Sequence, residues 1–144
     1  MLQRAKVETM SVTAVERTSQ HGAIVLDELS GLHRNLRRAV PDVYKGFGEL
    51  HKAAFAPGVL DTRTKELIAL AIGVVEGCDG CIASHAQGAA RAGATRQEAA
   101  EAIGVTFLMK GGPATIYGPR AYDAFCEFET TLHESDTDSP RVGS

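Results

Sequence analysis

The sequence lacks the features of a membrane protein, a nucleic-acid-binding protein or a secreted scaffold. It has no tryptophan, 6% aromatic residues and only three cysteines in 144 residues, and its formal net charge is −3. So small a negative charge offers no field that attracts nucleic acid or an anionic membrane. The longest apolar run, residues 67–75, is about half as long as a bilayer crossing requires. Because the N-terminus also lacks the apolar segment of a secretory signal, we expect a cytoplasmic protein.

The cysteines are few, but two of them are close together. Cys78 and Cys81 lie in the stretch EGCDGCIASHAQ, residues 76–87. In the cytoplasm, glutathione and thioredoxin keep structural disulfides reduced, so a close pair there is usually catalytic, redox-active or metal-binding. The odd number of cysteines points the same way.

The sequence predicts a single all-α domain, because helix-forming residues dominate and no long stretch alternates apolar and polar residues. Pro41 suits a first helical turn, Asp61 is a good N-cap, and Thr95 with Glu98 has the spacing of a capping box. About six helices are expected, over residues 11–38 with a break near Gly22, 41–55, 61–76, 78–93, 95–111 and 114–132. In domain terms this gives a helical extension over residues 1–40, a core domain over 41–133 and a disordered tail over 134–144.

Helical geometry places Cys78, Cys81 and His85 on one face of the fourth helix. With about 1.5 Å of rise per residue, His85 lies about 6 Å above Cys81 and about 10 Å above Cys78. The imidazole can therefore reach Cys81, directly or through one water. A thiol reacts as the thiolate and needs a base or a helix N-terminus to form it at neutral pH. We predict that Cys81 attacks and that Cys78, at the more exposed helix entrance, resolves.

Alternatives to this assignment remain open. In thioredoxin-like CxxC helices the first cysteine has the lower pKa, because it lies nearest the positive end of the helix dipole. Glu66 interrupts the apolar third helix and is the preferred carboxylate to pair with His85, with Glu76 as its rival. Zinc would need Glu66 or a neighbouring chain as a fourth ligand beside Cys78, Cys81 and His85. Haem attachment is excluded, since no histidine directly follows the second cysteine.

The segment KELIALAIGVVEGCDGCIASHAQGAARAGATRQEAAEAI, residues 65–103, resembles the core of the carboxymuconolactone decarboxylase and AhpD-like alkylhydroperoxidase family. The AhpD branch has a glutamate, eleven residues, and then CxxCxxxH. Glu66, Cys78, Cys81 and His85 match this pattern at the same spacings. The resemblance covers roughly residues 41–128 and includes the later GGP, residues 111–113, with Tyr117 after it.

The resemblance implies an all-α protomer that forms a homotrimer or homohexamer. It also implies a thiol-dependent hydroperoxidase or disulfide reductase that needs no cofactor and is reduced by an external thiol or dithiol. Cys81 resembles the peroxidatic cysteine, Cys78 the resolving cysteine, and His85 with Glu66 the proton relay. One position departs, because characterised AhpD proteins carry a histidine where this chain has Gly80.

Two other functions stay open. One is a decarboxylase that uses His85 and Glu66 in acid-base chemistry, although the decarboxylase branch typically lacks the cysteine pair. The other is a non-enzymatic redox or metal sensor. Of the remaining residues, Cys126 is expected to pack in the core, Tyr117 to line a pocket or pack in the core or an interface, and four histidines to lie on the surface: His21, His33, His51 and His133.

Overall fold

The computed structural model describes residues 20–137, and within this range it consists of six α-helices without a β-strand. In chain order these are α1 (Ala23–Ala39), α2 (Pro41–Phe55), α3 (Thr62–Glu76), α4 (Asp79–Arg91), α5 (Arg96–Lys110) and α6 (Ala114–Thr137). The predicted all-α class and the predicted number of helices are confirmed. In the described range no helix is both long and apolar enough to cross a membrane.

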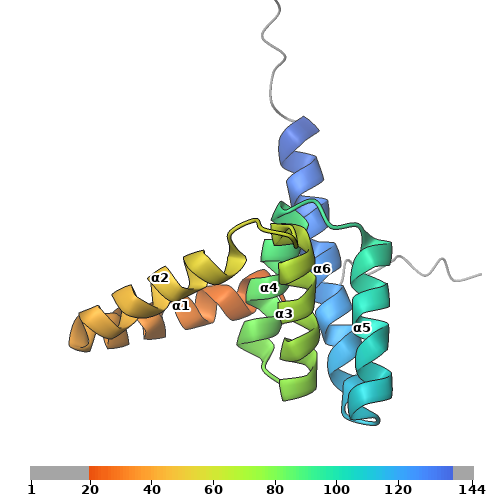
Figure 1. Cartoon of the computed structure of the whole chain (residues 1–144), viewed down its shortest axis with the longest axis horizontal. Coiled ribbons are helices and arrows are strands. Elements are labelled where there is room, and N and C mark those ends of the chain that lie inside the picture. Colours follow the sequence, from red (N-terminus) through yellow and green to blue (C-terminus); the bar gives the residue numbers. More distant parts are fainter. Residues whose placement is uncertain (1–19, 138–144) are drawn as a thin grey trace, which may run out of the picture.

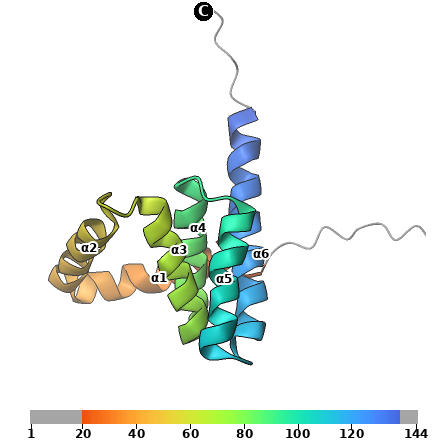
Figure 2. The same cartoon turned by 45° about the vertical axis from the view of Figure 1, so that its right-hand side comes forward.

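The helices form two unequal parts. Helices α3 to α6 pack side by side into a bundle, which we call the body (Figures 1 and 2). Helices α1 and α2 form a hairpin, the arm, which projects from one side of the body (Figure 1). Among the described residues, all the buried apolar side chains belong to the body, and Phe125, Leu70, Ile82 and Val74 are the largest that are fully buried. Neither α1 nor α2 contains a buried residue.

Local signals in the sequence explain where the body helices begin. The Asp61 side chain caps α3 by accepting a hydrogen bond from the Thr64 backbone N–H at 2.7 Å. At the start of α5, Thr95 and Glu98 exchange both hydrogen bonds of a capping box. Each bond satisfies a backbone N–H that has no partner within its own helix. The predicted caps of both helices are therefore confirmed.

The predicted break near Gly22 is confirmed, because α1 begins directly after this glycine. The Glu127 carboxylate of α6 accepts hydrogen bonds from the Ala23 backbone N–H, at 3.3 and 3.4 Å. A side chain at position 22 would collide with this same carboxylate. A body residue distant in sequence thus caps the helix, and this contact could not be inferred from the local sequence. Residues 11–19, which were also predicted to be helical, lie outside the described range.

The last helix is longer than predicted, because α6 continues to Thr137 instead of ending near Leu132. The prediction of a disordered tail was therefore wrong for residues 134–137. In these final turns Ser135 and Thr137 donate side-chain hydrogen bonds to backbone carbonyls three residues earlier. Polar residues that suggest a turn in the sequence thus bond back onto the helix. The remainder of the predicted tail, residues 138–144, lies outside the described range.

A tight turn joins α3 to α4 and brings the two helices together. Gly77 adopts a left-handed conformation with φ of 63°, which costs glycine little and other residues more. A Cβ at Gly77 would also lie 3.1 Å from the Tyr117 ring, so Tyr117 packs against this turn. At Gly73 of α3, an added Cβ would be 3.3 Å from the Cys81 Cβ of α4. These glycines set the close approach on which the site depends.

Candidate active site

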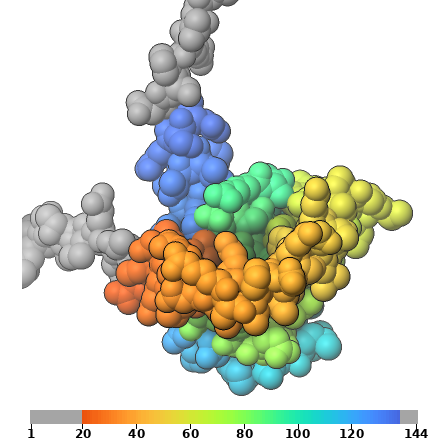
Figure 3. All heavy atoms as spheres, turned by 90° about the vertical axis from the view of Figure 1, so that its left-hand side faces the viewer, coloured from red at the N-terminus to blue at the C-terminus, as the bar shows by residue number. Residues whose placement is uncertain are grey.

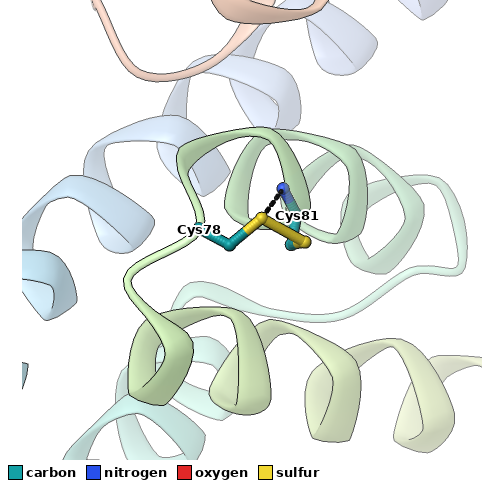
Figure 4. The surroundings of a disulfide bond; sticks show 2 residues. All are labelled: Cys78 and Cys81. Carbon is teal, nitrogen blue, oxygen red and sulfur yellow. Dashed lines mark hydrogen bonds between the residues drawn. A yellow bond between two sulfur atoms is a disulfide. The ribbon is translucent and has the colours of Figure 1, made fainter.

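Cys78 and Cys81 form a disulfide at the start of α4 (Figure 4), with their Cα atoms 5.2 Å apart. Cys78 is the N-cap of this helix, and its Sγ accepts a hydrogen bond from the Cys81 backbone N–H at 3.2 Å. Cys81 is exposed, whereas Cys78 is only half-exposed. The expectation that Cys78 is the more exposed cysteine was therefore wrong, because its capping role folds the side chain back over the first turn.

Glu66 of α3 and His85 of α4 form a hydrogen-bonded pair between these helices, with His85 Nδ1 2.8 Å from Glu66 Oε2. Glu66 is buried, with 7% of its surface exposed. An ionised carboxylate can only accept, so Nδ1–H is the donor of this hydrogen bond. Nε2 of a neutral imidazole is then left as the proton acceptor. Glu76, the rival carboxylate, instead lines a groove between α3 and α5.

Gly88 makes room for the Glu66 carboxylate. It lies on α4 less than one turn after His85, and a Cβ built there would overlap both carboxylate oxygens of Glu66. Any larger residue would have to displace the carboxylate from its position beside His85. Gly88 is thus a site residue that the sequence reasoning missed.

Two rings from the arm cover the imidazole of His85. The Phe55 ring of α2 stacks on His85 with centroids 5.3 Å apart and an angle of 22° between the ring planes. His51, one turn earlier on α2, lies 4.6 Å from the Phe55 ring and 6.3 Å from the His85 ring. His51 is on the surface, as expected, but it belongs to this ring cluster, which the sequence reasoning did not anticipate. These contacts join α2 to α4, which are far apart in the sequence, so no local sequence pattern predicts them.

His85 forms no direct hydrogen bond to either sulfur among the described residues, where its bonded partner is Glu66. The sequence allowed His85 to reach Cys81 either directly or through one water. While the two cysteines form a disulfide, the direct hydrogen bond is absent. The described residues also contain no group of three or more His, Cys, Asp or Glu side chains placed to hold a metal ion. The arrangement is suited to thiol chemistry beside a proton relay.

A comparison with protein families shows where the chain belongs. The model of the carboxymuconolactone decarboxylase family matches residues 41–124, which is more than half of the chain. The chain belongs to the carboxymuconolactone decarboxylase family. All four residues of the candidate site fall within the matched range.

Relatives of this family member include proteins of undescribed function. It is 37% identical over 100 residues to an uncharacterised protein of Cupriavidus necator, covering 69% of this chain and 88% of that protein. It is also 40% identical over 92 residues to uncharacterised protein 4 in the cox locus of Paracoccus denitrificans, covering 64% of this chain and 83% of that one.

Solved structures of the family share the fold. A carboxymuconolactone decarboxylase family protein from Legionella pneumophila is 36% identical, with a TM-score of 0.74 over 78% of this chain and 99% of that one. A family protein from Thermotoga maritima, with a suggested part in the antioxidative response, is 31% identical. Its TM-score is 0.55, over 67% of this chain and 95% of that one. The all-α architecture is therefore that of the decarboxylase family.

Gly80, where the AhpD-like pattern has histidine, lies beneath the arm. A Cβ at this position would be 2.9 Å from the Cδ1 atom of Leu29, on α1. The glycine of this family member therefore allows α1 to rest on the first turn of α4. A histidine here would meet the same leucine.

Two other residues are now placed. Cys126, which was expected to pack in the core, is half-exposed on α6 and is not among the buried core residues. It lies on the face of α6 that carries Tyr122, and its proximity raises the pKa of the Tyr122 hydroxyl. His33, expected to be a surface residue without a partner, is exposed but bonds through Nδ1 to the Tyr44 hydroxyl at 2.9 Å.

Proposed function

We propose that this family member is a thiol-dependent hydroperoxide reductase of the cytoplasm. The observation that carries the proposal is a CxxC pair at a helix N-terminus in which Cys81 is exposed. The pair lies one turn from His85, whose Nδ1 is hydrogen-bonded to the buried Glu66 carboxylate. The suggested antioxidative part of the Thermotoga maritima relative agrees with it. A reductase that acts on a substrate disulfide instead of a hydroperoxide would use the same residues, with the substrate disulfide as the oxidant.

In the first step, the Cys81 thiolate attacks one oxygen of the peroxide bond. His85 Nε2 takes the proton of the Cys81 thiol through a water, which leaves the thiolate. When the O–O bond breaks, Cys81 becomes a sulfenic acid, and the alkoxide takes this proton back from His85 and leaves as the alcohol. Exposure of Cys81 supports its role as the attacking sulfur, because a substrate must reach it. Glu66 accepts the Nδ1–H bond and stabilises the positive charge on His85 while the ring holds the proton.

In the second step, the Cys78 thiolate attacks the Cys81 sulfenic sulfur. A disulfide forms, and hydroxide leaves as water after taking a proton. The Cys81 backbone N–H points at the Cys78 sulfur, and this hydrogen bond favours the thiolate of Cys78 over its thiol. An external dithiol then returns both cysteines to the reduced state and is itself oxidised to a disulfide.

Mass spectrometry with peptide mapping tests this sequence of steps. One equivalent of hydroperoxide added to the reduced protein should remove about 2 Da from the peptide that holds both cysteines. Cys78→Ser should stop at a Cys81 sulfenic acid, and Cys81→Ser should lose turnover. Cys126→Ser is the matched control, since Cys126 lies outside the pair and should leave activity unchanged.

Three results would contradict the proposal. Full peroxide turnover by Cys81→Ser would show that the roles of the cysteines are wrong. A mass unchanged by hydroperoxide would refute the redox function. Turnover of a lactone acid by the double variant Cys78→Ser with Cys81→Ser would instead establish the decarboxylase alternative, in which Glu66 and His85 act alone.

We further propose that the chain forms a homotrimer or homohexamer through the groove between α3 and α5. The groove has a volume of about 580 Å³, and apolar side chains from both helices dominate its lining, including Ile68, Ile72, Val105 and Met109. An exposed apolar surface of this kind is typical of an interface between protein chains.

Light scattering tests the assembly with two matched variants. Ile72 is 57% exposed in the groove and Ile116 is 58% exposed outside it, on α6. Ile72→Glu should lower the molar mass to that of one protomer, because a buried unpaired charge is costly at an interface. Ile116→Glu should not change the mass. A wild type that is already monomeric, or an assembly that survives Ile72→Glu, would contradict this interface.

A further inference from the structure

A hollow with a volume of about 570 Å³ opens between α1 and α2 of the arm. Its lining includes Arg37 from α1 and Tyr44, Lys45 and Phe47 from α2, and contains no Asp or Glu. Figure 3 views the molecule from the side on which the arm projects. The hollow thus gathers positive charge on a chain whose formal net charge is −3.

The two cations of the hollow, Arg37 and Lys45, have no acidic partner in the part of the chain that the structure describes. Within residues 20–137, neither Arg37 nor Lys45 forms an ion pair with a carboxylate. The Arg37 guanidinium lies over the Tyr44 ring, with its carbon 5.2 Å from the ring centre. The Tyr44 hydroxyl is in turn bonded to His33. These contacts hold the guanidinium in place and leave its N–H donors free for an anion, which a guanidinium can bind through two parallel hydrogen bonds.

The hollow adjoins the candidate active site through His51. His51 lines the hollow and also packs on Phe55, and both rings lie against His85. A molecule whose anionic end is bound by Arg37 and Lys45 therefore meets a path of rings that leads to the proton relay. Phe47 adds an exposed apolar ring to the same wall, so the ligand should carry apolar as well as anionic groups.

We propose that this hollow binds the carboxylate of the substrate, and that the substrate is an organic hydroperoxide with an apolar chain and a carboxylate group. The inference rests on the proposed reductase function. Arg37 and Lys45 would bind the carboxylate, and the chain would pass along Phe47 and His51 toward Cys81. The residues of the arm would thereby decide which hydroperoxides are used, while those of the body carry out the reaction.

A pair of substrates that differ only in charge tests the proposal. The hydroperoxide of linoleic acid and its methyl ester are compared by kcat/KM, with uncharged dithiothreitol as the reductant. The wild type should prefer the acid, and Arg37→Gln or Lys45→Gln should lower the ratio of acid to ester by about tenfold or more, the size expected when a charge-assisted hydrogen bond is lost. The rate with the ester should fall less than the rate with the acid, because the ester has no negative charge for either residue to bind.

Matched controls come from the same two helices. Arg38 and Lys52 are exposed cations of α1 and α2 that do not line the hollow. Arg38→Gln and Lys52→Gln change the net charge of the protein equally and should leave the ratio unchanged. The proposal is overturned if the controls lower the ratio as much as the test variants do, or if Arg37→Gln leaves it unchanged.

A binding measurement separates this inference from the reductase function. Calorimetry with decanoate at low salt needs no turnover, and binding should weaken about tenfold in Arg37→Gln and not in Arg38→Gln. If the wild type reduces neither hydroperoxide, the reductase proposal fails, and the hollow is judged by decanoate alone. Equal affinity of both variants and the wild type, or no binding by the wild type, would overturn the anion site.

Discussion

The body and the arm use apolar residues in opposite ways. In the body many of these side chains meet in a common core, where Phe125 and Leu70 are completely buried, and others are exposed in the groove between α3 and α5. In the arm, Leu32, Leu36, Val43, Phe47 and Leu50 are all exposed, and neither helix has a buried residue. Yet the arm supplies Phe55 and His51, the two rings that cover His85. The stability of the folded chain therefore resides in the body, whereas the arm contributes to the surroundings of the site.

The sharpest test of this division replaces one large apolar residue in each part. Phe125→Ala in the body should lower the free energy of unfolding by about 3–5 kcal/mol, because Phe125 is 0% exposed and its loss leaves a cavity. Leu36→Ala in the arm, where Leu36 is 56% exposed, should cost less than about 1 kcal/mol. Urea unfolding of the protein, followed by circular dichroism, measures both. Similar losses for the two variants would mean that the arm is as much a part of the core as the body.

Gly88→Ala tests the packing between α3 and α4. The added Cβ overlaps the Glu66 carboxylate, so we expect a loss of about 1–3 kcal/mol in the free energy of unfolding, together with lower peroxide turnover. Gly104→Ala on α5 is the matched control, because no atom lies within 4 Å of its added Cβ. That change should stabilise the protein by about 0.4–1 kcal/mol. Unchanged stability and turnover in Gly88→Ala would show that Glu66 can move without consequence.

Gly80→His tests the contact that joins the arm to the body. The new side chain meets Leu29, so α1 should separate from α4 at a cost of about 1 kcal/mol. Hydrogen exchange should then increase at the α1 amides and remain slow at those of α6. Adding Leu29→Ala should restore part of the protection by making room for the imidazole. If exchange in α1 is unchanged by Gly80→His, the glycine is not needed for this contact.

The smallest effect concerns the start of α3 and its dependence on pH. Hydrogen bonds from the Thr64 hydroxyl and backbone N–H lower the pKa of Asp61 in the folded chain. The contribution of this cap to stability is therefore present above the unfolded pKa of about 3.9 and is lost as pH falls through the lower folded value. The asparagine of the variant Asp61→Asn can still cap the helix, but it has no carboxyl group that takes up a proton. The melting temperature of this variant should therefore fall less steeply below about pH 4 than that of the wild type. Equal slopes for both proteins would contradict this cause.

Much of the fold could be predicted from the sequence, because its signals are local. Asp61, the Thr95 and Glu98 box, and Gly77 act within one turn of the chain, and each marks a helix end in the structure. The break near Gly22 was also predicted, but for α1 the capping group could not be found in this way. Its cap is Glu127, more than one hundred residues away, and such a contact forms only when the chain has folded.

In the candidate site, too, local features could be predicted from the sequence and contacts between helices could not. The spacing of Cys78, Cys81 and His85 on one helix, and the family pattern that adds Glu66, were available from the sequence. The exposure of the two cysteines was not, because it depends on the side chain of Cys78 serving as the cap. Phe55 and His51 were missed since their ring contacts connect α2 to α4, and Gly88 was missed because its role is to leave space for a residue of another helix.

The capping role of Cys78 has a consequence for the reduction potential of the cysteine pair. When the pair is reduced, a thiolate at this position places a full negative charge at the positive end of the α4 dipole, where the Cys81 N–H can bond to it. Oxidation removes that charge, so the helix stabilises the dithiol form relative to the disulfide. Stabilisation of the reduced form raises the reduction potential of a cysteine pair. The start of α4 thus favours the reduced form of this cysteine pair, and it makes reduction of the disulfide by a modest thiol donor thermodynamically easier.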